Sequence, residues 1–545
     1  MDENATPGAK VPSAGTLGGR PALLRFAAVP VLVAVTVAVY APSLGNGFVW
    51  DDHEIIVSNP QTRDLSALPA VMLSVDETAP YYRPLARASY LLDYRLFGMN
   101  PSGFHAVSVL LHAAAVLALF WLAALLFGSQ PPAFLAALLF AVHPVNAEAV
   151  AFISGRNSLL ATLFSLLSVA LLIVAERRGS RRLCAGSALA FFAGLLSKET
   201  AIMALPFAAG WLWFFREDRE RSRRSHLLFL APHLLALAGY AALRVLALRS
   251  APPAAFRDAP ALAGRLLLNL YTVPRYLGLA LFPGDLAIFH PVPSPWPVLS
   301  LVAAWVGIAA VVALVVASRS AAGLAGLAWL GLNLLPIANL LPIPATAPIA
   351  ERYFYAPGVG LWIVLAEGAR RIAARVGWRA VAGGMAALAV GLSVRTLRRI
   401  GDWRDDLSLA ESAVRAEPSA PEAHFNLGVV LQAGRDLPGA RREWEETLKI
   451  YPGHALAITA VAAADAAAGD VAKAEAGLRQ ALAIDPRIAI AHYDLARICD
   501  RSARPGEAVT EYRAFLRYTR TRGEAAFVAR ARARLGALES APEGR

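Results

Sequence analysis

Apolar segments of a length suited to a membrane recur along the chain as far as residue 395, with short polar segments between them. A helix needs about 20 apolar residues to cross a hydrocarbon core of about 30 Å, and several of these segments lie near the lower limit. The pattern predicts an all-α, polytopic transmembrane bundle of about eleven spans, at residues 21–44, 104–127, 132–147, 158–175, 183–198, 200–215, 227–246, 298–317, 324–343, 354–369 and 379–395.

Residues 1–20 are polar and rich in Gly, Ala and Pro, so we predict a disordered tail there. The apolar run that follows is too long for the core of a signal peptide and lacks a convincing cleavage site, which favours a retained first span. The transmembrane domain is predicted to occupy residues 21–397, with a first outer loop at residues 45–103.

Arginine clusters in three connecting segments predict the orientation of the bundle. They lie at Glu176–Arg182, Arg216–Ser225 and Glu367–Arg379. The positive-inside rule places all three in the cytoplasm, together with the N-terminus. Eleven crossings then put the C-terminal tail on the outer side.

The segment Leu262–Phe282 leaves two interpretations open. It is apolar enough to cross the membrane, but it contains Pro274 and Arg275. A crossing here would also move the Glu367–Arg379 cluster to the outer side, against the positive-inside rule. We therefore favour a re-entrant or interfacial helix.

The C-terminal tail carries landmarks at a step of 34 residues, the period of the tetratricopeptide repeat (TPR). The landmarks of successive repeats are Asn426-Leu427-Gly428, Ala440, Trp444 and Pro452; Ala474, Leu478, Ala481 and Pro486; and Ala508 and Tyr512. A preceding half repeat supplies Ala413 and Pro418. We predict a TPR α-solenoid at residues 398–523 and a C-terminal helix and tail at residues 524–545. The alternative is an alanine-rich helical tail without a true repeat.

Composition supports a membrane protein: the chain is 57% hydrophobic and only 17% charged, against about 25% charged residues in soluble domains. The net charge of +12 does not indicate nucleic-acid binding, because the arginines cluster between apolar segments. Two cysteines in different domains exclude a disulfide framework. An Arg- and Ala-rich, Lys-poor chain is typical of a GC-rich bacterial genome, which predicts the inner membrane and a periplasmic outer face.

Candidate chemistry begins directly after the first span, where Asp51 and Asp52 stand between aromatic residues. Two adjacent carboxylates at a membrane boundary are costly unless they are solvated or used. The alternative is a solvated loop whose aspartates cap a short helix.

Further polar residues are predicted to gather at the same membrane face. Ionisable groups at membrane depth are functional candidates by default, although each could instead be a structural anchor or turn residue. The candidates for binding a phosphate or sugar are Arg83, His105, His143, Glu148, Arg156, Lys198, Glu199, Glu351, Arg352 and Tyr353.

A divalent metal is considered but not favoured, and no cofactor is predicted with certainty. The potential ligands are Asp51, Asp52, His53, Glu54 and His105. Their spacing matches no closed metal site.

The motifs resemble the TMTC family, the transmembrane and TPR-containing proteins of the GT-C glycosyltransferase superfamily. The resemblance extends from about Gly45 to about Arg520. It rests on FVWDDHEIIVSNP, YYRPL, FGMNPSGFHAVSVLLHA, LFAVHPVNAEAV with SGRNSLLA, LLSKET, ERYFYAPGVG and the junction GDWRDDLSLAESAVRAEPSAPEAHFNLG.

This resemblance implies an enzyme that moves mannose or a similar hexose from a polyprenyl-phosphate carrier to an acceptor at the outer face. The catalytic carboxylate of the family matches Asp51–Asp52, and we favour Asp51. The TPR groove would bind an acceptor protein or another partner. Lys198, Arg156, Arg83 and Arg352 are candidates for stabilising the departing phosphate, and a single base on the acceptor suggests inversion.

Two other classes remain open: a membrane-anchored TPR scaffold or assembly factor, and a transporter of a lipid carrier. An anchor needs only one or two spans. A transporter would place ionisable residues at mid-span, whereas most of those in this chain lie near span ends.

Overall fold

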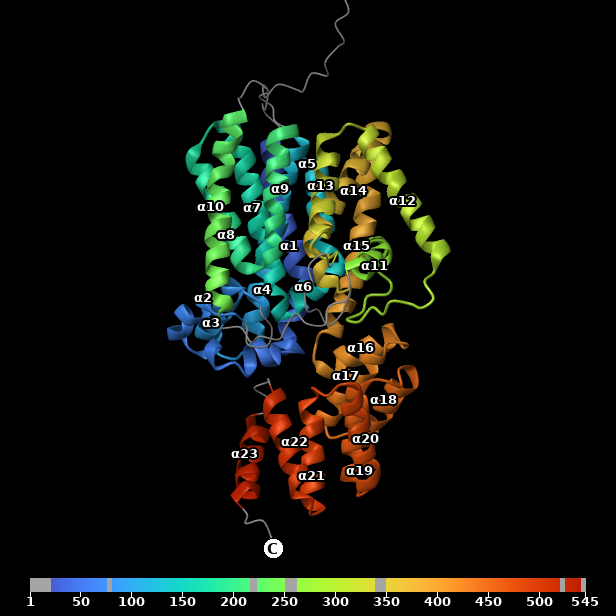
Figure 1. The fold of residues 1–545 in the computed structure, drawn as a ribbon. Helices are drawn as coiled ribbons and strands as arrows, with labels where there is room; N and C mark the ends of the chain where they lie inside the picture. Colours follow the sequence, from blue (N-terminus) through green and yellow to red (C-terminus); the bar gives the residue numbers. More distant parts are fainter. Residues whose placement is uncertain are drawn as a thin grey trace, which may run out of the picture.

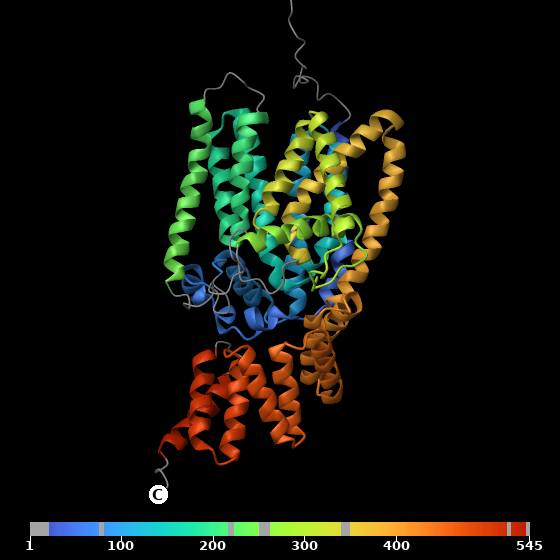
Figure 2. The same cartoon turned by 45° about the vertical axis from the view of Figure 1, so that its right-hand side comes forward.

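The computed structural model describes residues 21–75, 81–215, 223–249, 262–338, 349–519 and 525–540, and these residues form helices and loops without strands. The predicted disordered tail at residues 1–20 lies outside the described residues. The helices form a membrane bundle with a helical solenoid at one end of it (Figures 1 and 2). The all-α fold class is confirmed.

Each predicted span contains a helix. These helices are α1 (Pro21–Tyr40), α4 (Pro101–Phe127), α5 (Gln130–Val142), α7 (Arg156–Arg178), α8 (Arg181–Ser197), α9 (Ala204–Gly210) with η8 (Trp211–Phe215), α10 (Arg223–Leu248), α12 (Val298–Ala317), α13 (Ala321–Leu334), α14 (Tyr355–Val376) and α15 (Trp378–Asp402). Local signals set their ends. For example, the Asn100 side chain caps the start of α4, and Gly128 ends that helix with a positive φ of 63°.

By length and composition, six helical segments of the described residues could cross a membrane: Ala27–Gly45, Pro101–Phe127, Ile153–Arg178, Leu227–Leu248, Val298–Ala317 and Trp378–Asp402. The pair Gln130–Val142 and Pro144–Ala151, bent by 54°, makes a seventh if it is one broken span. The other predicted spans hold helices that are too short or too charged for this criterion, such as the 14-residue α13. Eleven full spans therefore remain a prediction.

α11 (Leu262–Leu281) is not among these segments, and it lies across the upright helices in Figure 2. Leu262, Leu266 and Leu267 in the first half of α11 are exposed, whereas Tyr276 and Leu279 in its second half are buried. The crosswise direction of α11 and its exposed leucines suit a position at the membrane interface. This arrangement agrees with the interfacial interpretation of Leu262–Phe282.

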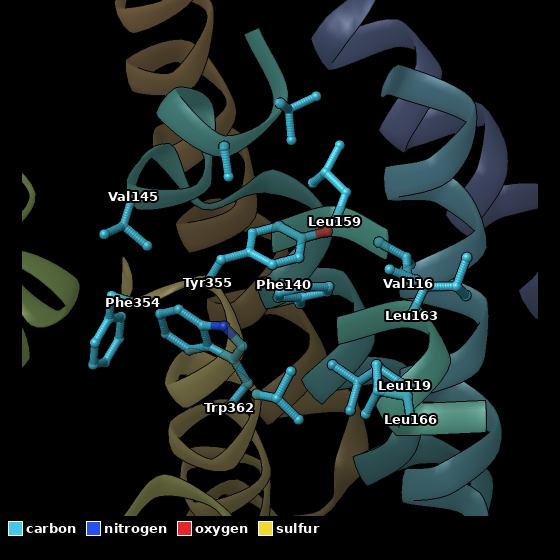
Figure 3. Packing of buried hydrophobic residues seen from close by; sticks show 14 of the residues in the cluster. Val116, Leu119, Phe140, Val145, Leu159, Leu163, Leu166, Phe354, Tyr355 and Trp362 are labelled. Carbon is cyan, nitrogen blue, oxygen red and sulfur yellow. The ribbon is translucent and has the colours of Figure 1, made fainter. Parts of the chain in front are cut away.

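The bundle core contains a cluster of aromatic residues and a histidine. Tyr355 on α14 lies beside His112 on α4, with 2.7 Å between the hydroxyl oxygen and Nδ1, and Phe140 and Trp362 pack nearby (Figure 3). Against this core, α13 and α14 approach closely, since a Cβ on Gly360 would lie 2.4 Å from the Gly326 carbonyl oxygen. Small residues commonly permit such approaches in membranes.

By contrast, α12 presents apolar side chains almost all round, with Leu299 84% and Leu314 71% exposed. A helix that is apolar on every side and unburied needs an apolar solvent. Lipid is the solvent that fits α12.

The loops divide between the two ends of the bundle (Figure 1). One end carries the turns between α4 and α5, α7 and α8, α12 and α13, and α14 and α15. The other carries the first loop, with η1 (Ala41–Gly45), η2 (His53–Val57), η3 (Pro60–Arg63), η4 (Leu65–Ala67), α2 (Leu68–Leu73) and α3 (Pro84–Phe97). It also carries η5 (Pro144–Asn146), α6 (Ala147–Ala151), η6 (Ile153–Gly155), η7 (Glu199–Met203) and η9 (Glu351–Tyr353).

The solenoid continues from α15 at the first-loop end. Its helices are α16 (Asp406–Ala416), α17 (Pro421–Ala433), α18 (Leu437–Ile450), α19 (Ala455–Ala467), α20 (Val471–Ile484), α21 (Ala489–Arg501), α22 (Pro505–Tyr518) and α23 (Ala525–Ser540). Ala440, Ala474 and Ala508, one repeat apart, are all fully buried. A Cβ on Gly428 would meet the Trp444 indole at 2.3 Å, so this repeat requires glycine at that position.

We predict that the first loop and the solenoid lie outside, opposite the turn between α4 and α5. Ala70→Cys and Ser129→Cys place a thiol at an exposed position on each end of the bundle. In a background with Cys184 and Cys499 changed to serine, a membrane-impermeant maleimide should label position 70 but not position 129 of intact cells. The reverse pattern would overturn the orientation.

Candidate active site

Asp51 and Asp52 stand in a tight turn that sends their side chains in different directions. The turn begins at Trp50, whose φ of 53° is uncommon for a bulky residue. The Trp50 indole is held between two rings, stacked on Phe152 at 5.8 Å and edge-on to Phe289 at 5.9 Å. These ring contacts help to hold the Trp50 backbone in this conformation.

Asp52 is completely buried. One of its carboxylate oxygens accepts hydrogen bonds from the Ser154 backbone N–H at 2.8 Å and the Ser154 hydroxyl at 2.6 Å, and the other accepts from the Val49 N–H at 3.2 Å. Burial raises the pKa of Asp52 to about 7, although these hydrogen bonds oppose the rise. Asp52 thus fastens the first loop to the turn that precedes α7.

Asp51 is exposed and lies near the Arg352 guanidinium, with which it interacts electrostatically. Arg352 forms an ion pair with the fully buried Glu148, which also accepts a hydrogen bond from the Arg352 backbone N–H at 2.9 Å. The guanidinium lies 5.5 Å from the centre of the Trp50 ring. Arg352 is therefore fixed next to the turn that carries Asp51.

A second cation, Lys198, lies near the same Tyr353 ring. Its ammonium is 5.3 Å from the centre of the Tyr353 ring, and Arg352 is 5.0 Å from the same ring. Lys198 is only 7% exposed and donates a hydrogen bond to the Ser158 hydroxyl at 2.8 Å. Among the described residues no carboxylate forms a salt bridge with Lys198, so its charge is not neutralised by a direct ion pair.

Arg83 and Glu199 complete this group of charges. The guanidinium donates two hydrogen bonds to the carboxylate, at 2.6 Å and 3.1 Å, and lies 4.2 Å above the Tyr81 ring. Burial alone would raise the pKa of Glu199, but the adjacent Arg83 lowers it to about 2. Because Arg83 is paired bidentately, it has less capacity for a further anion than Lys198 has.

The other candidates are engaged elsewhere. Arg156 pairs with Asp93 at 2.5 Å, and His105 lies 3.3 Å from the Gly47 carbonyl oxygen. The His143 ring accepts from the Val145 N–H at 3.2 Å, and Glu351 pairs with Arg399 at 3.2 Å. These contacts favour supporting roles for the four residues. The structure therefore brings together Asp51, Arg83, Glu148, Lys198, Glu199, Arg352 and Tyr353.

Sequence reasoning missed Ser154 and Ser158, which hold Asp52 and Lys198. It also missed Asp406, which accepts a hydrogen bond from the Trp50 N–H at 2.9 Å. The SGRNS motif contains both serines, but nothing in its spacing assigns either to a carboxylate or an ammonium.

The candidate metal ligands do not converge on one point, since His53 contacts Asp406 at 2.7 Å and Asp52 contacts Ser154. No group of three or more His, Cys, Asp or Glu in the described residues could hold a metal ion.

Comparison with known proteins points to one family. Residues 84–243 match the family described as dolichyl-phosphate-mannose-protein mannosyltransferase, and residues 393–455 and 462–525 match the tetratricopeptide repeat. The predicted TPR repeats and the resemblance to the TMTC family are confirmed.

Relatives include a protein O-mannosyl-transferase of Caenorhabditis elegans, 26% identical over 78% of this chain and 63% of the relative. Another is protein O-mannosyl-transferase TMTC4 of Homo sapiens, 28% identical over 73% of this chain and 63% of the relative. The chain thus spans less than two thirds of the length of these relatives.

Two solved structures show weaker likeness. ArnT of Cupriavidus metallidurans in its apo state is 16% identical, with a TM-score of 0.45, over 78% of this chain and 76% of that one. The oligosaccharyltransferase of Archaeoglobus fulgidus is 13% identical, with a TM-score of 0.39, over 72% and 55%.

We predict that Glu148→Ala destabilises the protein, because it leaves Arg352 buried without its ion-pair partner. The loss should be on the order of 3–5 kcal/mol, seen as a clear fall in the thermal midpoint in detergent. Glu445→Ala, which removes an exposed i,i+4 partner of Arg441, should cost only about 0.3–0.5 kcal/mol. Equal losses for the two variants would contradict a specific role for the Glu148–Arg352 pair.

Proposed function

We propose that this protein is a membrane glycosyltransferase that moves mannose or a similar hexose from a polyprenyl-phosphate carrier to a protein Ser or Thr hydroxyl, or another acceptor. The observation that carries the proposal is that the buried Lys198 and the fixed Arg352 lie 5.3 Å and 5.0 Å from the Tyr353 ring centre, and that Arg352 interacts electrostatically with Asp51. Two cations beside an accessible carboxylate suit a reaction that releases a phosphate and deprotonates an acceptor.

Asp51 is proposed as the general base. A hydroxyl is a poor nucleophile, and a positioned base must take its proton as the oxygen attacks. Asp51 is the exposed member of the pair and can reach an acceptor, whereas Asp52 has both oxygens engaged inside the protein. Asp52 therefore orients the turn, and Asp51 acts on the acceptor.

Lys198 and Arg352 are proposed to bind the carrier phosphate. When the bond from the anomeric carbon to the phosphate oxygen breaks, negative charge grows on that phosphate, and fixed cations stabilise it. Lys198 has no carboxylate salt bridge among the described residues, so a bound anion would relieve the cost of its burial. The acceptor oxygen forms the new bond, Asp51 takes the acceptor proton, and the lipid phosphate leaves. Direct displacement by one base inverts the anomeric centre.

We further propose that this site faces outward and that the TPR groove recruits the acceptor, since the solenoid lies at the same end of the bundle (Figure 1). The two relatives described above come from animals, so a bacterial inner membrane rests on composition alone. A scaffold would have no use for a buried lysine without a direct ion pair and an arginine beside an exposed carboxylate, and these observations favour the enzyme.

Asp51→Asn should lower turnover by about 10²–10⁴-fold, because asparagine cannot accept the proton. Asp52→Asn should be milder, since it alters only the support of the turn. The assay is sugar transfer from a purified polyprenyl-phosphate sugar in nanodiscs. Lys198→Ala should also weaken carrier binding, because the phosphate is present in both ground and transition states. Wild-type rates for the Asp51→Asn, Asp52→Asn double variant would refute the proposed site.

The transfer rate should fall as the pH drops through about 7, the pKa of Asp52. Only the ionised carboxylate can accept all the hydrogen bonds that hold the turn. Ser154→Ala removes one bond that lowers this pKa, so the falling limb should move to higher pH. A pH profile at saturating carrier for both proteins tests the shift, and an unmoved limb would contradict this role for Asp52.

A further inference from the structure

The end of α15 and the start of α16, here called the solenoid junction (residues 399–406), contact the first loop next to the candidate catalytic turn. The Asn46 side chain donates to the Ile400 carbonyl oxygen at 3.1 Å, and the Gly47 N–H donates to the Arg404 carbonyl oxygen at 2.8 Å. Asp406 then reaches the turn itself. These contacts join parts of the chain that lie more than 350 residues apart in sequence, with a separation of 356 for Trp50 and Asp406.

The Asp406 carboxylate holds both ends of the aspartate pair. One oxygen accepts the Trp50 N–H at 2.9 Å, and the other lies 2.7 Å from the His53 Nε2. Trp50 and His53 are the residues immediately before and after Asp51–Asp52. A single side chain from the solenoid junction therefore spans the turn that presents Asp51.

We infer that Asp406 is a positioning residue for the proposed transfer reaction, acting through the backbone of Trp50 to place the Asp51 carboxylate. This inference rests on the proposed function. Trp50 has a positive φ that its own side chain disfavours, so the turn needs contacts that hold it. Asp406 supplies the hydrogen bond to the backbone at that residue.

Asp406 is not the residue that caps α16. Asp405, not Asp406, caps α16, accepting a hydrogen bond from the Ser408 N–H at 2.8 Å. Asp406 occupies the first turn of α16, yet its carboxylate contacts the first loop. Helix capping and positioning of the turn are thus divided between two adjacent aspartates.

The segment that carries Arg352 is also held by the end of α15. Arg399, near the end of α15, pairs with Glu351, and both side chains are fully buried. Glu351 directly precedes Arg352. The end of α15 therefore fixes the segment that carries Arg352, by the ion pair of Arg399 with Glu351. The start of α16 fixes the turn that carries Asp51, by the hydrogen bond to Asp406.

The test uses the full-length protein in nanodiscs with four variants. Asp406→Ala removes both contacts, and Asp406→Asn keeps an oxygen that can accept the Trp50 N–H. His53→Ala removes only the histidine contact. Asp405→Asn is the matched control, because asparagine also caps helices well. Turnover and KM are measured for the polyprenyl-phosphate sugar. In parallel, hydrogen–deuterium exchange is measured for peptides covering residues 46–57.

Asp406→Ala should lower kcat by on the order of 10²-fold, as expected for a displaced catalytic group, with KM for the carrier nearly unchanged. Exchange in residues 46–57 should rise, while exchange in α17–α22 stays as in the wild type. Asp406→Asn should recover most of kcat, and Asp405→Asn should stay near wild type. His53→Ala should lower kcat less than Asp406→Ala does, because the hydrogen bond from the Trp50 N–H to Asp406 remains.

An unchanged kcat for Asp406→Ala, or an equal loss for Asp405→Asn, would overturn the inference. If the wild-type protein transfers no sugar from any carrier, the proposed function fails separately. Exchange then decides the structural link, since unaltered protection of residues 46–57 in Asp406→Ala would show that Asp406 does not hold the turn.

Discussion

Charge neutralisation at one end of an apolar bundle is the constraint on which the rest of this structure depends. Buried ions are costly unless each has a partner, and the bundle meets this requirement with cross-chain pairs: Arg83–Glu199, Arg156–Asp93, Arg352–Glu148 and Arg399–Glu351. Each pair joins segments far apart in sequence, so pairing the charges also fixes the loops relative to one another. Lys198 forms no salt bridge among the described residues, which is why it is the proposed position for a bound phosphate.

Sequence periodicity predicted much of the fold, because apolar spans and repeat landmarks are local patterns. The step of 34 residues identified the buried Ala440, Ala474 and Ala508 correctly. The number of spans was less accessible. Helices such as α13 are shorter than a membrane is thick, and their burial against neighbours is a tertiary property that composition does not record.

Residue type also predicted where charges would gather, but not which of them a substrate could use. Arg156 and Lys198 are both buried basic residues near span ends, yet Arg156 forms an ion pair with Asp93, whereas Lys198 donates a hydrogen bond to the Ser158 hydroxyl and lies near the Tyr353 ring. The difference depends on partners that are remote in sequence. Lys198 and Ser158, for example, lie 40 positions apart. Asp406 escaped prediction for the same reason.

The clamp on Trp50 has a consequence for biosynthesis. The turn that carries the aspartates is made early, and its partner Asp406 follows after 356 further positions, once the last predicted span has been synthesised. Closing so long a loop is slow relative to local folding. A nascent chain would therefore carry both carboxylates before Asp406 can hold their turn, and the proposed site would be completed only with the first solenoid helix.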